Sequence, residues 1–156
     1  MEALVLSQRA LGPTLRWMIL AASNLAVAQP GQFVMLRCAG PESSDPFLRR
    51  ALFIADADPK AGTVTLLYSN SEPGARWLDA AVPGQTLDLV GPLGRPVALA
   101  HKARQVLLIA EGGAAAPLLF LARRSSSSML LLHIATAREL ELPPFLLPPG
   151  GRVPLQ

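Results

Sequence analysis

A change in hydrophobic pattern near residue 100 constrains this chain more than any other feature. Before it, short runs rich in β-branched and aromatic residues are separated by turns that contain glycine and proline. The predicted strands cover residues 2–8, 14–22, 33–38, 50–55, 63–69 and 85–90, with a short helix at 75–80. Such a succession of short strands predicts a β-barrel or sandwich.

The pattern after residue 100 is typical of a different architecture. Residues 105–110 form a continuous apolar run, as expected for a parallel strand that is buried on both faces. A Gly-Gly turn, a predicted helix at 115–124 and a second apolar run at 129–134 follow, and a short helix is predicted at 136–140. This order predicts the opening of a βαβ unit. We therefore expect two domains, residues 1–99 and 100–156.

Charge and aromatic content argue against nucleic-acid binding. The formal net charge is +3, and the arginines are scattered rather than gathered in a stripe. Aromatic residues make up only 5% of the chain, too few for a platform on which bases stack. Cys38 is the one cysteine, so this sequence cannot form an internal disulfide or ligate an iron–sulfur cluster. A reducing cytoplasm is the expected compartment.

No apolar run reaches the ~20 residues needed to span a bilayer, so no membrane association is expected. Residues 16–28 resemble a signal peptide, but Ser23 and Asn24 interrupt the apolar stretch and Glu2 lies where positive charge is usual. A strand is the preferred interpretation of this segment, and export stays as the alternative. No Ser/His/Asp set, paired carboxylates or metal-ligand spacing is present, so neither catalytic nor metal-binding residues are predicted.

Four segments, in order along the chain, carry a family resemblance. They read Pro30-Gly31-Gln32-Phe33-Val34-Met35, Leu48-Arg49-Arg50, Thr65-Leu66-Leu67-Tyr68 and Leu89-Val90-Gly91-Pro92-Leu93-Gly94. Together they resemble the ferredoxin-reductase-like flavoproteins, including the electron-transfer subunits of the NAD-dependent dihydroorotate dehydrogenases. The resemblance implies a six-stranded antiparallel β-barrel of the flavin-reductase type, followed by a truncated Rossmann-like parallel sheet. It also implies flavin adenine dinucleotide (FAD) as the cofactor, in a site weakened by substitutions.

The resemblance assigns the first cofactor contacts to Arg50, Ala51, Leu52 and Phe53, where the family has Arg-Pro-(Ile/Leu)-Ser. Arg50 can pair with a cofactor phosphate through its planar fork. The family's serine hydroxyl faces the reactive edge of the flavin, and Phe53 has no hydroxyl. From the residues alone, the Arg49-Arg50 pair is equally typical of a surface pair beside a core strand.

Further contacts are implied at two sites along the barrel. Leu67, Tyr68 and Ser69 match a Leu-Tyr-Arg strand, so Ser69 replaces a cationic residue. Tyr68 either flanks the flavin or is an ordinary barrel aromatic. Gly74 and Ala75 match a Gly-Thr pair at a helix start, where backbone N–H groups can bind phosphate.

The last predicted contact is the turn at Gly112 and Gly113, where the family has more glycines. Glycines let the backbone approach a pyrophosphate. Here Glu111 adds negative charge, and alanines at 114–116 are expected to place methyl groups toward the ligand. A nicotinamide-nucleotide site and a simple strand-to-helix turn both remain open.

Two functions are therefore considered. In the first, the chain is a flavin-dependent module that passes electrons between a nicotinamide nucleotide and a partner dehydrogenase. In the second, it is a non-catalytic paralogue that acts as a structural or regulatory subunit of a larger complex. Both imply a protein partner, and a homo-oligomer stays open as an alternative.

Overall fold

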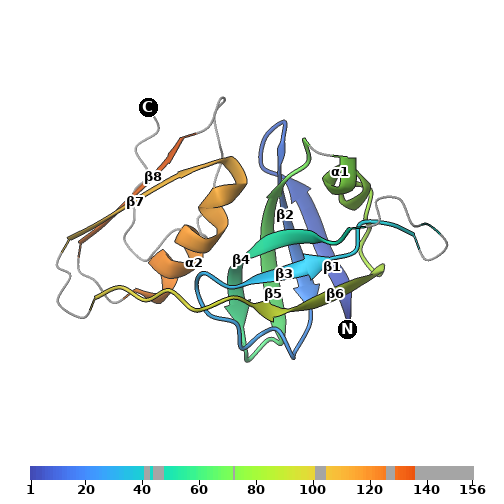
Figure 1. Cartoon of the computed structure of the whole chain (residues 1–156), viewed down its shortest axis with the longest axis horizontal. Helices are drawn as coiled ribbons and strands as arrows, with labels where there is room; N and C mark the ends of the chain where they lie inside the picture. The colour runs from blue at the N-terminus through green and yellow to red at the C-terminus, as the bar shows by residue number, and fades with distance from the viewer. Residues whose placement is uncertain (41–42, 44–47, 72, 101–104, 126–128, 136–156) are drawn as a thin grey trace.

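Six antiparallel strands close into a barrel (Figure 1). The computed structural model describes residues 1–40, 43, 48–71, 73–100, 105–125 and 129–135. The barrel strands are β1 (Glu2–Ala10), β2 (Leu15–Ala21), β3 (Phe33–Leu36), β4 (Arg50–Asp58), β5 (Thr63–Ser69) and β6 (Thr86–Leu93), and helix α1 (Pro73–Asp79) connects β5 to β6. Their order around the barrel is β1-β2-β5-β4-β3-β6. The predicted six-stranded antiparallel barrel is thus confirmed.

The strands β4 and β6 run furthest beyond the ends that their sequence pattern predicts. β4 continues to Asp58 because its ladder with β5 extends to the pair Asp58–Thr63. β6 continues to Leu93, which pairs with Phe33. A register shift between β3 and β6 accommodates the Gly91-Pro92 dipeptide, which on sequence alone reads as a turn.

The second part of the chain is a strand–helix–strand unit. It contains β7 (Gln105–Glu111), a 3₁₀ turn η1 (Gly112–Ala114), α2 (Ala115–Arg124) and β8 (Met129–Ala135). β7 and β8 are parallel, which agrees with the predicted βαβ opening. The predicted boundary at residue 100 falls between β6 and β7.

Helix α2 packs against the outside of the barrel (Figure 1). Its residues Leu119 and Ala115 share a cluster with Trp17 and Leu67, which point outward from β2 and β5. This contact explains why β2 is apolar on both faces: Met18 and Leu20 fill the barrel interior, and Trp17 lies under the second unit. The strand predicted at residues 14–22 is confirmed as β2.

The expectation that residues 105–110 are buried on both faces is wrong. Leu108 and Ala110 are buried against α2, whereas Leu107 and Ile109 are 58% and 65% exposed. Among the described residues, α2 covers one face of the β7–β8 pair. The continuous apolar run therefore does not imply two covered faces here.

Some predictions fall on residues that the structure does not describe. The short helix predicted at 136–140 lies outside the described residues. Within the described part of the chain, no helix is both long enough and apolar enough to cross a membrane.

Candidate functional site

The predicted cofactor contacts of β4 and β5 lie where these two strands are not paired with each other. Residues 50–53 of β4 pair with β3, and residues 67–69 of β5 pair with β2. The ladder between β4 and β5 starts only at Ile54, opposite Leu66. Each stretch therefore has one strand edge outside the ladder, and such an edge presents backbone N–H and C=O groups for binding.

The side chain of Arg50 lies across Gly74, near the start of α1. A Cβ atom at position 74 would be only 2.7 Å from Arg50 Nε and 3.4 Å from Cys38 Cβ. A side chain at position 74 would therefore displace the guanidinium. The structure thus brings together two residues at which the family resemblance predicts phosphate contacts, although they are far apart along the chain.

Cys38 lies on the core side of this contact. It is fully buried, and its thiol is 3.8 Å from the carbonyl oxygen of Leu36. Burial raises the pKa of the Cys38 thiol to about 11, although the positive charge of Arg50 opposes the shift. The thiol is therefore protonated near neutral pH, and Cys38 acts as a small core residue beneath Arg50.

Arg49 has a different role from its neighbour. It donates hydrogen bonds to the Asp88 carboxylate at 2.5 Å and to the Asp88 carbonyl oxygen at 3.1 Å. This pairing lowers the pKa of Asp88. Arg49 therefore ties the start of β4 to β6, while Arg50 turns toward α1.

The next three residues of β4 alternate across the barrel wall. Leu52 packs against the barrel core, whereas Ala51 and Phe53 point outward. Phe53 is 42% exposed, and its ring meets the ring of Phe33 edge-on, with the centroids 6.1 Å apart. An aromatic ring thus stands at the position where the family has a hydroxyl.

Tyr68 belongs to the barrel interior. Its side chain is 2% exposed, and its hydroxyl donates a 3.0 Å hydrogen bond to Gln8 Oε1. Burial, with the nearby Asp79 carboxylate, raises the pKa of Tyr68. Of the two roles considered for Tyr68, this packing matches the barrel aromatic. Its neighbour Leu67 points the other way, into the cluster under α2.

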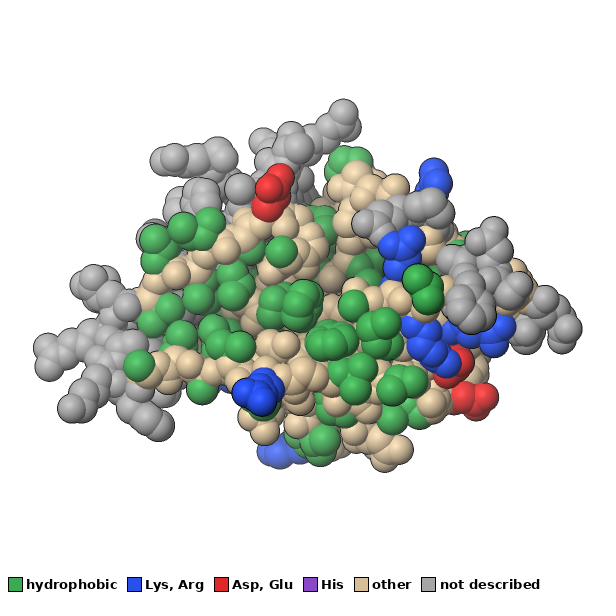
Figure 2. All heavy atoms as spheres, in the orientation of Figure 1, with side chains coloured by type: hydrophobic (Ala, Val, Ile, Leu, Met, Phe, Trp, Pro, Cys, Tyr) green, Lys and Arg blue, Asp and Glu red, His purple; other side chains and the backbone are tan. Residues whose placement is uncertain are grey.

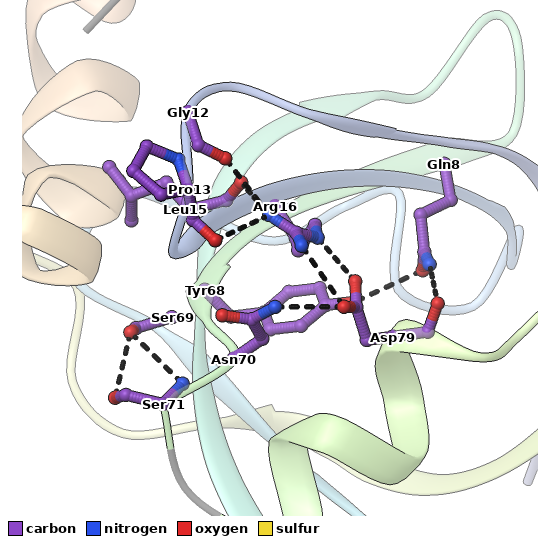
Figure 3. Close-up of polar contacts among 10 residues, drawn as sticks. All are labelled: Gln8, Gly12, Pro13, Leu15, Arg16, Tyr68, Ser69, Asn70, Ser71 and Asp79. Atoms are coloured by element: carbon purple, nitrogen blue, oxygen red, sulfur yellow. Dashed lines mark hydrogen bonds and ion pairs between the residues drawn. The ribbon is translucent and has the colours of Figure 1, made fainter. Parts of the chain in front are cut away.

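A polar network joins the end of α1 to β1, β2 and the end of β5 (Figure 3). Arg16 binds both carboxylate oxygens of Asp79 through Nε and Nη2. Asn70 donates to the same carboxylate at 2.8 Å, and Gln8 donates to the Asp79 carbonyl oxygen at 2.8 Å. The hydrogen bonds from Arg16 are the main reason that the pKa of Asp79 is lowered. The network thus anchors α1, and with it Gly74, to the barrel.

Sequence reasoning missed this network because its residues are far apart along the chain and no motif links them. Arg16 and Asp79 are 63 residues apart, and each is an ordinary surface residue by its neighbours in the chain. The only usable signal was Asp79 near the end of a predicted helix. A carboxylate is unfavourable there unless a cation compensates for the helix dipole.

The glycine turn lies against the end of β5. Gly112 has a φ of +52°, a conformation that favours glycine. A Cβ atom at Gly113 would lie 3.4 Å from the backbone nitrogen of Ser69, so the turn approaches the barrel closely. Gly113 and the predicted contact Ser69 are therefore neighbours in space.

The alanines near the predicted contacts do not point where the sequence suggested. Ala115 and Ala116 are fully buried in the cluster between α2 and the barrel, so only Ala114 of the three exposes its methyl group. The expectation that all three methyl groups face a ligand is wrong. Ala75 is also buried, in the barrel core.

The arrangement is suited to binding an anion. It combines a half-buried guanidinium, a glycine that gives it room, and two strand edges outside the ladder. In the described residues, no group of three or more His, Cys, Asp or Glu side chains could bind a metal ion. A phosphate group fits such a combination.

Curated relatives share this sequence pattern. The electron transfer subunit of dihydroorotate dehydrogenase B (NAD(+)) from Bacillus caldolyticus is 40% identical over 86 residues, which cover 54% of this chain and 33% of the relative. The same subunit from Geobacillus thermodenitrificans is 36% identical over 113 residues, which cover 69% and 42%. These subunits are homologues of the chain. The matches cover only a third to about two fifths of the relatives' length.

Solved structures agree on the fold. An NADH-dependent reduced ferredoxin-NADP oxidoreductase superposes with a TM-score of 0.79 at 21% identity, covering 92% of this chain and 52% of that protein. The ferredoxin reductase of carbazole 1,9a-dioxygenase, in its FAD-free form, superposes with a TM-score of 0.73 at 25% identity, covering 90% and 45%. No protein-family profile matches the chain. The barrel is therefore that of the ferredoxin-reductase-like flavoproteins.

Proposed function

We propose that the chain binds FAD beside the unpaired stretches of β4 and β5 and takes part in electron transfer as a subunit of a dihydroorotate dehydrogenase complex. The contact between Arg50 and Gly74 carries this proposal, because it joins two predicted contacts from separate parts of the chain. The homologous electron transfer subunits and the ferredoxin reductase superposition support it.

Each predicted contact has a distinct task in this proposal. Arg50 binds the cofactor's pyrophosphate through charge-assisted hydrogen bonds, and Gly74 leaves the space that the guanidinium needs. Ala51, Leu52 and Phe53 on β4, with Leu67, Tyr68 and Ser69 on β5, provide the two backbone edges beside the ring.

Two further pairs complete the proposed contacts. Ala75 keeps the start of α1 packed on the barrel core, next to Gly74. Gly112 and Gly113 allow the second unit to come close to Ser69.

When bound, the flavin supplies the redox chemistry, and the protein holds and orients it. The nicotinamide nucleotide and the partner dehydrogenase belong to this proposal as electron donor and acceptor.

One observation favours the second candidate, a subunit without bound cofactor. Phe53 projects a large exposed ring where the family has a serine, and it offers no hydrogen bond to a flavin. We propose that this ring occupies part of the space of the flavin and weakens its binding. In that case the chain serves as a structural or regulatory subunit.

The test that separates the two candidates is a flavin titration of the purified chain. The visible absorbance spectrum reports flavin retained from the cell, and quenching of flavin fluorescence on titration gives the dissociation constant for FAD. Riboflavin, which lacks phosphate, is the matched control ligand. The electron-transfer proposal requires FAD to bind more tightly than riboflavin. If neither binds at micromolar concentration, the cofactor-free subunit is the function that remains.

A further inference from the structure

The outer face of β4, β3 and β6 is entirely apolar over two rows of paired residues. Antiparallel partners point to the same face of a sheet, so the register shows which side chains are neighbours. One row joins Phe53, Phe33 and Leu93, and the next joins Ala51, Met35 and Val90. We call these six residues the apolar wall.

Such a surface is unusual on the outside of an antiparallel barrel. Antiparallel sheets that face water on one side normally alternate apolar and polar residues. Val90 is 44% exposed and Phe53 is 42% exposed, so the wall is in contact with solvent in the described structure. Figure 2 shows hydrophobic side chains gathered across the middle of this face of the molecule.

The opposite part of the barrel shows what an apolar outer face is for in this protein. There Trp17, Ala55 and Leu67 also point outward, and α2 covers them so that each is at most 2% exposed. Outward apolar residues on the barrel thus serve to dock another layer of structure. The apolar wall has no such layer among the described residues.

The charged residues at the ends of the wall indicate the chemistry of the missing layer. Arg37, Arg49 and Arg50 lie at one end, where β3 ends and β4 begins. Exposed Arg95 follows β6 at the other end. Two carboxylates also lie at the arginine-rich end. Asp88 binds Arg49, and Glu2 lies opposite Asp88 in the ladder between β1 and β6. Among the described residues, the ends of the wall therefore carry more arginines than carboxylates, which suits a partner whose apolar centre is bordered by carboxylates.

A second copy of the chain fits this surface poorly. Two walls related by a two-fold axis would bring the arginines at the ends of one copy against those of the other. Like charges placed opposite each other oppose association. The charge pattern therefore favours a different protein as the occupant.

We propose that the apolar wall is the surface on which the partner dehydrogenase subunit docks, with an apolar patch over Val90 and Met35 and carboxylates facing Arg95. This proposal rests on the proposed function, since it takes the partner from there. Phe53 lies both in the wall and beside the proposed flavin site, so a partner on the wall would sit next to the flavin. That position suits the transfer of electrons between the two proteins.

The test measures binding of the full chain to the dihydroorotate dehydrogenase catalytic subunit of the same organism by titration calorimetry. Val90→Glu places a carboxylate in the centre of the wall and should weaken binding at least about tenfold, the effect of one central contact residue. Val82→Glu is the matched control, because Val82 is 60% exposed and precedes β6. The control should leave the dissociation constant unchanged.

A second variant protects the test against misfolding. Arg95→Glu alters only the exposed rim and should slow association, with the difference disappearing at high salt. Circular dichroism and flavin content are measured on every variant. Loss of partner binding with flavin content unchanged supports docking on the wall independently of the cofactor proposal.

Three results would overturn the docking proposal. The first is that the unmodified chain and the catalytic subunit do not associate. The second is that Val90→Glu and Arg95→Glu bind as tightly as the unmodified chain. The third is that sedimentation shows a dimer that Val90→Glu dissociates, which would assign the wall to a second copy. A chain that lacks flavin but binds the partner, with binding weakened by Val90→Glu, would contradict only the flavin assignment.

Discussion

The two halves of β4 perform different tasks although they belong to one continuous strand. Residues 54–58 pair with β5 and lie under α2, where Ala55 is fully buried. Residues 50–53 pair only with β3 and leave Ala51 and Phe53 exposed. A register shift between Ile54 and Asp56 separates the two halves. The strand is thus structural where both faces are covered, and available for binding where they are not.

Side-chain contacts follow the same division. In the second half, Asp56 forms an ion pair with Arg123 at 3.1 Å, and the carbonyl oxygen of Ala57 accepts a 2.8 Å hydrogen bond from Arg124. Both contacts attach α2 to the barrel. In the first half, Arg50 reaches toward Gly74. Substitutions in the two halves should therefore affect different measurements, stability in one and ligand binding in the other.

The largest expected effect is on the covered half. Phe120 of α2 is fully buried in the barrel cluster. Phe120→Ala should lower the free energy of unfolding by about 3–5 kcal/mol, because it leaves a cavity between α2 and the barrel. Denaturant unfolding followed by circular dichroism measures this loss. Leu107→Ala, at a position 58% exposed, is the control and should cost much less. Equal losses in the two variants would show that α2 is not a packed layer.

Arg50→Ala tests the open half. We expect FAD to bind more weakly by about 1.5–3 kcal/mol, the worth of a hydrogen bond to a charged group. The free energy of unfolding is measured on the same variant, because Arg50 is half-buried and its side chain also lies against Gly74. Fluorescence titration with FAD measures the affinity.

Arg49→Ala is the control for Arg50→Ala because it removes an identical charge next to it. Arg49 is bound to Asp88, so its loss should reduce stability slightly and leave FAD affinity nearly unchanged. If the two variants lose the same affinity, the effect is general electrostatic attraction and the assignment of Arg50 fails.

Phe53→Ser should tighten FAD binding by about 1 kcal/mol, since the serine hydroxyl adds a hydrogen bond and the smaller side chain leaves room for the ring. Phe53→Leu is the control, because it shortens the side chain without adding a hydroxyl. The flavin-to-protein ratio after purification is the measurement. A wild-type chain that is already saturated with flavin would contradict this idea.

Two carboxylates near the two halves should give opposite pH dependences. The pKa of Asp79 is lowered by Arg16, so its stabilisation is present above the unfolded-state pKa and is lost as the pH falls through the folded-state value. The pKa of Asp56 is raised by burial, which outweighs Arg123, so its contribution is present at low pH and is lost as the pH rises through the folded-state value.

The corresponding asparagine variants test this contrast by unfolding between about pH 3 and pH 7. Asp79→Asn should lower stability at neutral pH by about 1 kcal/mol and lose less stability on acidification than the unmodified chain. Asp56→Asn should instead lose more stability on acidification than the unmodified chain, because it lacks the contribution that Asp56 makes at low pH. Parallel pH curves for both variants would mean that neither carboxylate is shifted as described.

Much of the fold could be predicted from the chain because its signals are local. Alternating strands, glycine and proline turns, and two apolar runs around a Gly-Gly turn depend only on residues close in sequence. The family resemblance also predicted phosphate contacts at Arg50 and at Gly74. The order of the elements needed no information about long-range packing.

Other features required the tertiary structure, because they depend on which surfaces meet. Two adjacent arginines are alike in sequence, yet Asp88 engages Arg49 and Gly74 makes room for Arg50. Tyr68 is a core residue because β5 turns it inward, and the alanines after Gly113 are buried because α2 lies on the barrel. Side-chain identity determined what each residue can do, whereas burial and the unpaired edges of β4 and β5 decided where it can act.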